Sequence, residues 1–274
     1  MSHVWDAMRK HKAEEPSPEP SPETPSRGGQ KRVSSGGTPD QAKLKPEVKP
    51  LDDGYAELLT AHHDRGGAVT EQFRALRTHL LAHYGGKHFS TIVTSAEPGE
   101  GKTVTCLNLG IVLAERPERR TIVVDGDLRK GNIASYLNIE NSPGMADLVR
   151  GDTTIEAVVR PTVYANLFVI PAGQAQRHEV GELMGRPELQ DIAGDLRRRY
   201  DYILFDTPPV NRAADAAVLG QAVDGALVVV RMNKTHRESV DRAIRLLHAS
   251  SVTVAGLILT HQKFYIPNYL YRYS

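Results

Sequence analysis

A short glycine-rich loop holds the residues whose types and spacing point most directly to chemistry. Residues 95–103 read SAEPGEGKT, after an apolar strand pattern and before a helical one. A phosphate-binding loop requires this context, because its glycines let backbone N–H groups face a phosphate and the helix N-terminus adds partial positive charge. The lysine would reach phosphate oxygens, and the threonine hydroxyl would be a ligand for Mg²⁺. We expect the nucleotide to be bound by Pro98, Gly99, Glu100, Gly101, Lys102, Thr103 and Val104.

Three aspartates end two other apolar runs. Asp125 and Asp127 follow the run 122–124 (IVV), and Asp206 follows the run 202–205 (YILF). Ligands of an open α/β sheet lie outside the carboxyl ends of its strands, so these carboxylates should converge beside the glycine-rich loop. The combination predicts a site for ATP and Mg²⁺. We expect Mg²⁺ to be bound by Thr103, Asp127 and Asp206, and catalytic roles for Lys102, Asp125, Asp127 and Asp206.

The last ten residues contain four of the ten tyrosines of the chain. Pro267 argues against a packed core strand in this segment. One interpretation is a flexible tail that carries tyrosine hydroxyls to a phosphoryl-transfer site, and the other is an aromatic tail that docks on a partner. A tyrosine hydroxyl, with a pKa of about 10, gains from a base as it attacks. Asp125 is the candidate base, although the sequence does not separate it from Asp127 in that role. In the first interpretation the phosphate acceptors are Tyr265, Tyr269, Tyr271 and Tyr273.

A helical pattern over residues 68–84 carries a charged segment, EQFRALR. Its charged members are Glu71, Arg74 and Arg77. The simplest interpretation is an exposed helix face with an ion pair between residues three positions apart.

Together these motifs resemble the bacterial tyrosine kinase family, whose members are P-loop proteins related to the ParA and MinD ATPases. The resemblance covers about residues 68–274. Its Walker A motif matches residues 96–103, its Walker A′ motif residues 122–129 and its Walker B motif residues 203–208. Two features belong to the kinase family in particular, namely the terminal tyrosine cluster and a Glu-x-x-Arg-x-x-Arg signature.

The resemblance implies an ATP-dependent tyrosine autokinase that regulates capsule or exopolysaccharide polymerisation and export. It implies that Glu71, Arg74 and Arg77 form a subunit contact in a ring-like homo-oligomer, in which one protomer's tail reaches its neighbour's site. It also implies two partners: a separate transmembrane chain-length regulator that activates the kinase, and a tyrosine phosphatase.

The alternative is an ATPase of the ParA/MinD type that positions cargo. Those ATPases carry a signature lysine near the start of the loop, where this chain has Glu97. A glutamate cannot supply positive charge to a partner's phosphates, so we favour the kinase. Thr260 ends the last strand pattern, where relatives often have an asparagine that contacts the purine, which leaves adenine recognition open.

Alternating strand and helix patterns predict an α/β fold: a P-loop NTPase with a doubly wound, mostly parallel sheet and helices on both faces. We expect helices over 102–115, 179–199, 213–219 and 234–249 and strands over 88–94, 121–125, 166–170, 202–206, 225–231 and 252–260. Eight of the 17 prolines fall in the first 50 residues. We therefore predict a disordered arm (1–51), a P-loop kinase domain (52–262) and a flexible tyrosine-cluster tail (263–274).

The composition of the chain limits its possible partners and its cellular location. The chain has 34 basic and 33 acidic residues, so no global field favours nucleic acid, and we expect no nucleic-acid partner. Its single cysteine, Cys106, excludes an internal disulfide and is expected to be a buried, inert thiol. No uncharged apolar run approaches the ~20 residues that span a bilayer. We therefore expect a cytoplasmic protein that a partner recruits to the inner face of the plasma membrane.

Overall fold

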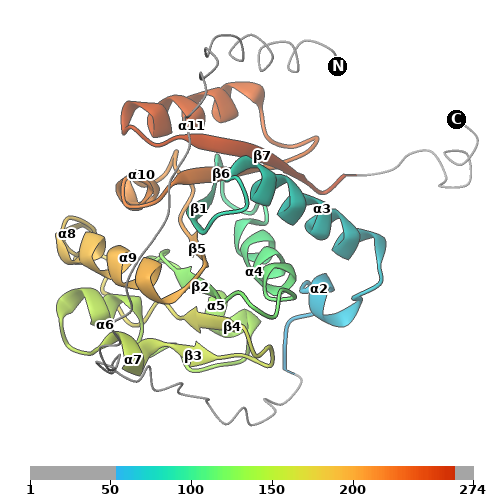
Figure 1. Ribbon diagram of the computed structural model, residues 1–274. Coiled ribbons are helices and arrows are strands. Elements are labelled where there is room, and N and C mark those ends of the chain that lie inside the picture. The colour runs from blue at the N-terminus through green and yellow to red at the C-terminus, as the bar shows by residue number, and fades with distance from the viewer. Residues whose placement is uncertain (1–53, 263–274) are drawn as a thin grey trace, which may run out of the picture. The chain divides into compact units, whose positions relative to one another are not determined.

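The structure is a computed structural model that describes residues 54–262 (Figure 1). The predicted proline-rich arm (1–51) and the predicted tyrosine tail (263–274) lie outside the described residues, so these boundaries stay predictions.

A seven-stranded sheet forms the centre of the described chain, in the order β3-β4-β2-β5-β1-β6-β7 (Figure 1). Every neighbouring pair is parallel except β3 and β4. The predicted doubly wound, mostly parallel sheet is therefore confirmed. The strands are β1 (Phe89–Ser95), β2 (Thr121–Asp125), β3 (Arg160–Pro161), β4 (Leu167–Ile170), β5 (Tyr202–Asp206), β6 (Gly225–Arg231) and β7 (Val254–Thr260).

Helices cover both faces of the sheet, as predicted. One face is covered by α2 (Thr60–His63), α3 (Ala68–His83), α4 (Lys102–Leu113) and α5 (Ile133–Tyr136). The other face is covered by α6 (Met145–Arg150), α7 (Ile155–Val158), α8 (Val180–Met184), α9 (Glu188–Arg199), α10 (Asp215–Gly220) and α11 (Arg237–Ala249).

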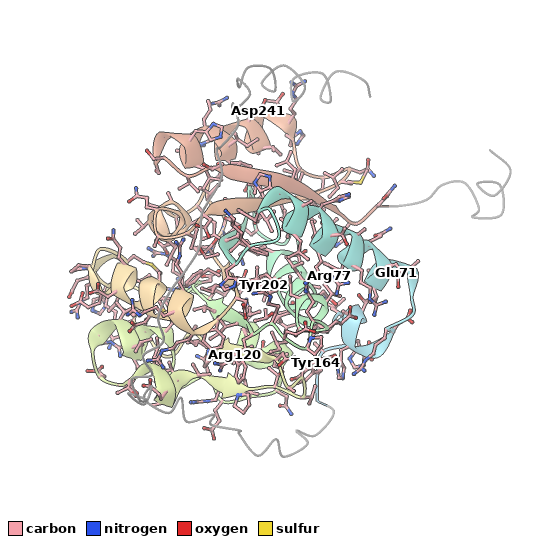
Figure 2. The ribbon with its side chains drawn as sticks, viewed as in Figure 1. Glu71, Arg77, Arg120, Tyr164, Tyr202 and Asp241 are labelled. Carbon is pink, nitrogen blue, oxygen red and sulfur yellow. The ribbon has the colours of Figure 1, made fainter. Side chains whose placement is uncertain are left out.

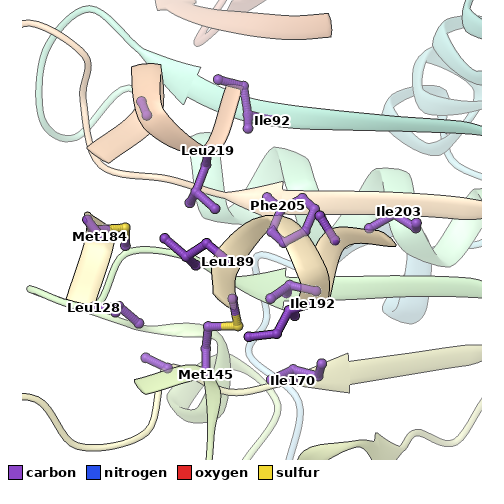
Figure 3. Close-up of a cluster of buried hydrophobic side chains, with 14 of the residues drawn as sticks. Ile92, Leu128, Met145, Ile170, Met184, Leu189, Ile192, Ile203, Phe205 and Leu219 are labelled. Atoms are coloured by element: carbon purple, nitrogen blue, oxygen red, sulfur yellow. The ribbon is translucent and has the colours of Figure 1, made fainter. Parts of the chain in front are cut away.

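The two faces hold two hydrophobic clusters, and the strand residues alternate between them. In β5, Ile203 and Phe205 pack with Leu189 and Ile192 of α9 in one cluster (Figure 3), whereas Leu204 belongs to the other. Because neighbouring strand residues point to opposite faces and both faces are covered, four successive residues of β5, Tyr202 to Phe205, are apolar. This double burial explains the continuous apolar runs in the sequence.

One predicted helix is wrong. The helical pattern over 179–199 contains two helices, α8 and α9, separated by Gly185–Pro187. Pro187 lacks a backbone N–H and disfavours a helical residue before it, so it stands as the N-cap of α9 and cannot continue α8. The short elements α2 and β3 were not predicted, because four and two residues are too few to show a period.

Within residues 54–262, no helix is both long enough and apolar enough to cross a membrane. Cys106 is completely buried in α4, and this burial raises the pKa of its thiol well above the ordinary value. The prediction of a buried cysteine is therefore confirmed. Its expected inertness stays a prediction that the burial favours.

Candidate active site

The glycine-rich loop joins β1 to the N-terminus of α4, which begins at Lys102. Gly99 and Gly101 have φ angles of 77° and 92°, in the left-handed region. A Cβ at Gly101 would come no closer than 3.8 Å to another side chain. The left-handed backbone conformation at position 101, and not a lack of room for a side chain, therefore requires glycine there.

The sheet brings the predicted carboxylates to the loop. The register of β2 and β5 places Asp125 beside Asp206, and the register of β1 and β5 places Val93 beside Asp206. The Thr103 hydroxyl donates a hydrogen bond of 2.6 Å to Oδ2 of Asp206. Lys102 Nζ lies 3.4 Å from Oδ2 of Asp127. The expected convergence at the carboxyl edge of the sheet is therefore present.

Negative charge exceeds positive charge in this buried cluster. Burial, the charge of Asp206 and the charge of Asp127 raise the pKa of Asp125 well above its ordinary value, against hydrogen bonds from the Ile133 and Asp127 amides. Burial raises the pKa of Asp206 to about 6, although Lys102 and the Thr103 hydroxyl oppose the shift.

Burial by itself would lower the pKa of the Lys102 ammonium. The charges of Asp206, Asp127 and Asp125 outweigh burial and hold that pKa above its ordinary value. One lysine thus faces three carboxylates. An additional cation would relieve their mutual repulsion.

The oxygen atoms of this cluster fit Mg²⁺. Asp206 Oδ1 is buried and has no hydrogen-bond partner among the described residues, while Oδ2 of the same carboxylate is next to the Thr103 hydroxyl. No group of three or more His, Cys, Asp or Glu side chains within residues 54–262 is arranged as an all-protein metal cage. Mg²⁺ is usually bound by one or two carboxylates together with phosphate and water oxygens, which agrees with this donor set.

A cleft of about 670 Å³ opens over the loop, in the size range of small-molecule sites. Its walls include the P-loop, Asp127, Arg129, and Thr260 at the end of β7 with His261 just after it. Leu58, Val69 and Phe73, from the α2–α3 region, also line the cleft. The sequence did not mark these three side chains as part of a site; Val69 and Phe73 lie on the predicted helix 68–84, where apolar residues usually indicate core.

Arg129 has a partner that the sequence analysis missed. Its guanidinium makes two hydrogen bonds to the buried carboxylate of Asp215 at the start of α10, of 2.8 and 3.2 Å. This ion pair fixes the segment after β2 to the segment after β5, so it holds the Asp127 and Asp206 segments together.

The signature residues Glu71, Arg74 and Arg77 lie on α3. Figure 2 labels Glu71 and Arg77. Arg74 makes the expected ion pair with Glu71, at 2.5 Å. Both arginines also contact the Glu115 carboxylate just beyond α4, at 2.5 Å from Arg74 and 2.7 Å from Arg77. Within the described chain, this network fastens α3 to the end of the P-loop helix.

The sheet order, the P-loop and the strand-end aspartates define the class of the protein, a P-loop NTPase. Residues 91–250 match the AAA domain family, which is more than half of the chain. The chain is 30% identical over 195 residues to the tyrosine-protein kinase YwqD of Bacillus subtilis, covering 71% of this chain and 81% of YwqD. It is 33% identical over 189 residues to the putative tyrosine-protein kinase EpsB of Ralstonia nicotianae, covering 69% of this chain but only 25% of EpsB.

Solved structures agree with these relatives. The VpsO kinase domain superposes with a TM-score of 0.63 and 31% identity, over 72% of this chain and 100% of that domain. The chain belongs to the bacterial tyrosine-protein kinases. The septum site-determining protein MinD of Pyrococcus horikoshii has a related fold, with a TM-score of 0.53 and 25% identity over 63% of this chain and 69% of MinD. That lower similarity does not favour the positioning-ATPase alternative.

Proposed function

We propose that this tyrosine kinase phosphorylates its own C-terminal tyrosines, using ATP and Mg²⁺. The observation that carries the proposal is that a described residue close in sequence to the tyrosine tail lines the cleft. His261 lines the same cleft as Lys102 and Thr103, and the first tail tyrosine, Tyr265, follows only four residues later. The proposed acceptors are Tyr265, Tyr269, Tyr271 and Tyr273.

In the proposed mechanism, the loop amides and Lys102 bind the β- and γ-phosphates of ATP. Phosphoryl transfer depends mainly on positioning and on neutralising charge, which these groups supply. Thr103, Asp127 and Asp206 would hold Mg²⁺, whose chemistry is to neutralise the charge that develops on the phosphate oxygens.

Asp125 is the proposed base for the tyrosine proton. Burial raises the pKa of Asp125 and so its affinity for a proton. Asp125 is completely buried, however, whereas Asp127 contacts Lys102 and borders the cleft, so Asp127 is the alternative base. Asn variants distinguish the two roles, because D125N should lower kcat without changing the Mg²⁺ requirement, and D127N should raise the Mg²⁺ requirement. The reverse result would exchange the roles.

The remaining proposals concern oligomeric assembly, partners and cellular location. We propose a ring-like homo-oligomer in which Glu71, Arg74 and Arg77 contact the next subunit and the tail reacts in trans. A separate transmembrane chain-length regulator would activate the kinase and recruit it to the inner face of the plasma membrane. A tyrosine phosphatase would reverse the modification, and the cycle would regulate capsule or exopolysaccharide polymerisation and export.

The test is incubation of the purified chain with Mg²⁺ and ATP, with and without the cytoplasmic tail of a candidate activator, followed by mass spectrometry. Phosphotyrosine in the tail that disappears in K102A is the expected result. ATP hydrolysis without phosphotyrosine under both conditions would favour the positioning ATPase instead.

A further inference from the structure

Glu100 has an unusual setting for a residue of a phosphate-binding loop. It is only 2% exposed, and its carboxylate accepts three hydrogen bonds. One comes from the Glu97 amide within the loop, at 2.7 Å. The other two come from the Arg231 amide, at 3.2 Å, and from the Thr235 hydroxyl.

The carboxylate does not serve the phosphates directly. Glu100 is absent from the described residues that border the cleft, so its carboxylate does not face a nucleotide bound there. A negative charge close to a bound phosphate is unfavourable, and a loop that binds anions gains nothing from it electrostatically. The side chain must therefore contribute in another way.

The three donors show what the side chain connects. Arg231 ends β6, and Thr235 lies in the connection from β6 to α11. The backbone carbonyl of Glu100 also accepts a hydrogen bond of 2.8 Å from the Thr260 hydroxyl, at the end of β7. Glu100 thus fastens the loop to the ends of the two strands on one side of it.

The neighbours of Glu100 make such a fastening necessary. Gly99 and Gly101 flank it, and both adopt left-handed backbone conformations. Glycines lose more conformational freedom on ordering than other residues, so an unfastened loop would have to become ordered when phosphate binds. A loop that is already ordered does not incur this cost at binding.

We infer that Glu100 is a positioning residue that holds the loop in its phosphate-binding conformation through Thr235 and Arg231. The inference rests on the proposed nucleotide site. It assigns the side chain a role in nucleotide affinity without contact to the nucleotide. It also makes that affinity depend on the β6–α11 connection, a segment with no phosphate-binding motif of its own.

The test is a fluorescence titration of the purified full chain with mant-ADP and Mg²⁺, which measures binding separately from phosphorylation. Gln at position 100 keeps the shape of the side chain but has only one acceptor oxygen. The Glu100 carboxylate accepts at both oxygens, from the Glu97 amide at Oε2 and from the Arg231 amide at Oε1, so Gln must lose at least one of these hydrogen bonds. E100Q should bind about tenfold more weakly, equivalent to about 1.4 kcal/mol. T235V should bind about threefold to tenfold more weakly, because it removes one donor and leaves the loop sequence unchanged.

Two controls separate positioning from general destabilisation. T235S keeps the hydroxyl and should bind like the unmodified chain. E179Q makes the same substitution at a partly buried glutamate elsewhere in the fold, which accepts hydrogen bonds from Arg150, and should leave affinity within twofold. In kinetics, E100Q should raise the KM for ATP while kcat at saturating ATP changes less than threefold.

Folded E100Q and T235V chains that bind mant-ADP as well as the unmodified chain would overturn the inference. If E100Q does not fold, T235V compared with T235S decides alone. An unmodified chain that binds no mant-ADP would refute the proposed nucleotide site, whereas one that binds it without forming phosphotyrosine would refute only the autokinase proposal.

Discussion

Gly110 lies in the second half of α4, the helix that begins with Lys102 and Thr103, where it faces the sheet. A Cβ built at this position would come 2.7 Å from Cγ2 of Val123 and 3.4 Å from Cδ1 of Leu167. Val123 is completely buried in β2, and its branched side chain cannot turn aside. The replacement G110A must therefore move α4 or strain the sheet.

The expected magnitude follows from two opposing effects. Overpacking a dense core costs roughly 1–3 kcal/mol. Replacing a helical glycine by alanine gains about 1 kcal/mol. G110A should therefore destabilise the fold by about 1 kcal/mol, which lowers Tm by about 2–4 °C in a domain of this size. G194A is the matched control, because Gly194 lies in α9 and its added Cβ would meet only Arg198, at 3.8 Å. It should stabilise by about 0.5–1 kcal/mol.

Chemical denaturation and thermal melting of both variants measure these free energies. The opposite signs are the decisive feature, since the chemical change is identical in the two helices. Titration with mant-ADP adds a functional measure, because a displaced α4 would also move the Thr103 hydroxyl away from Asp206. If G110A were as stabilising as G194A, the close packing of the P-loop helix on β2 would be wrong.

Three further predictions follow from the site and its supports. E115Q should reduce the free energy of unfolding by about 0.5–1.5 kcal/mol in urea denaturation at pH 7, because it weakens a partly exposed network with two arginines. Hydrogen bonding from Arg74 chiefly lowers the pKa of Glu115 below 4.5, despite opposing burial, so this stabilisation is present above pH 4.5 and lost as pH falls through the lower, folded-state value. The two proteins should therefore become equally stable in acid, and a constant difference would contradict the assignment. D206N should raise the Mg²⁺ concentration needed for half-maximal nucleotide affinity at least tenfold in a titration with Mg²⁺; an unchanged requirement would remove Asp206 from the metal site. The four proposed acceptors are Tyr265, Tyr269, Tyr271 and Tyr273. Replacing all four by Phe should leave mant-ADP affinity intact while removing most of the phosphate found by mass spectrometry. Unchanged phosphate incorporation would show that the acceptors are other residues.

The sequence by itself determined the class of fold and the family. The loop SAEPGEGKT and the apolar runs that end in Asp125 and Asp206 are local patterns, and the rules of parallel sheets are enough to bring them together. The break between α8 and α9 was also readable, because Pro187 stands within the predicted helix. The helical period on both sides concealed it.

Only the tertiary structure decided which side chains support the site. Glu100 contacts Thr235, which is 135 residues away in sequence, and Arg129 contacts Asp215. Glu115 contacts Arg74 across 41 residues. No local pattern reveals these pairs, because they depend on how the strands are ordered and how the helices pack on them. Sequence patterns report the conformation of neighbouring residues, whereas a buried charge is stabilised by partners that only the folded chain brings within hydrogen-bonding distance.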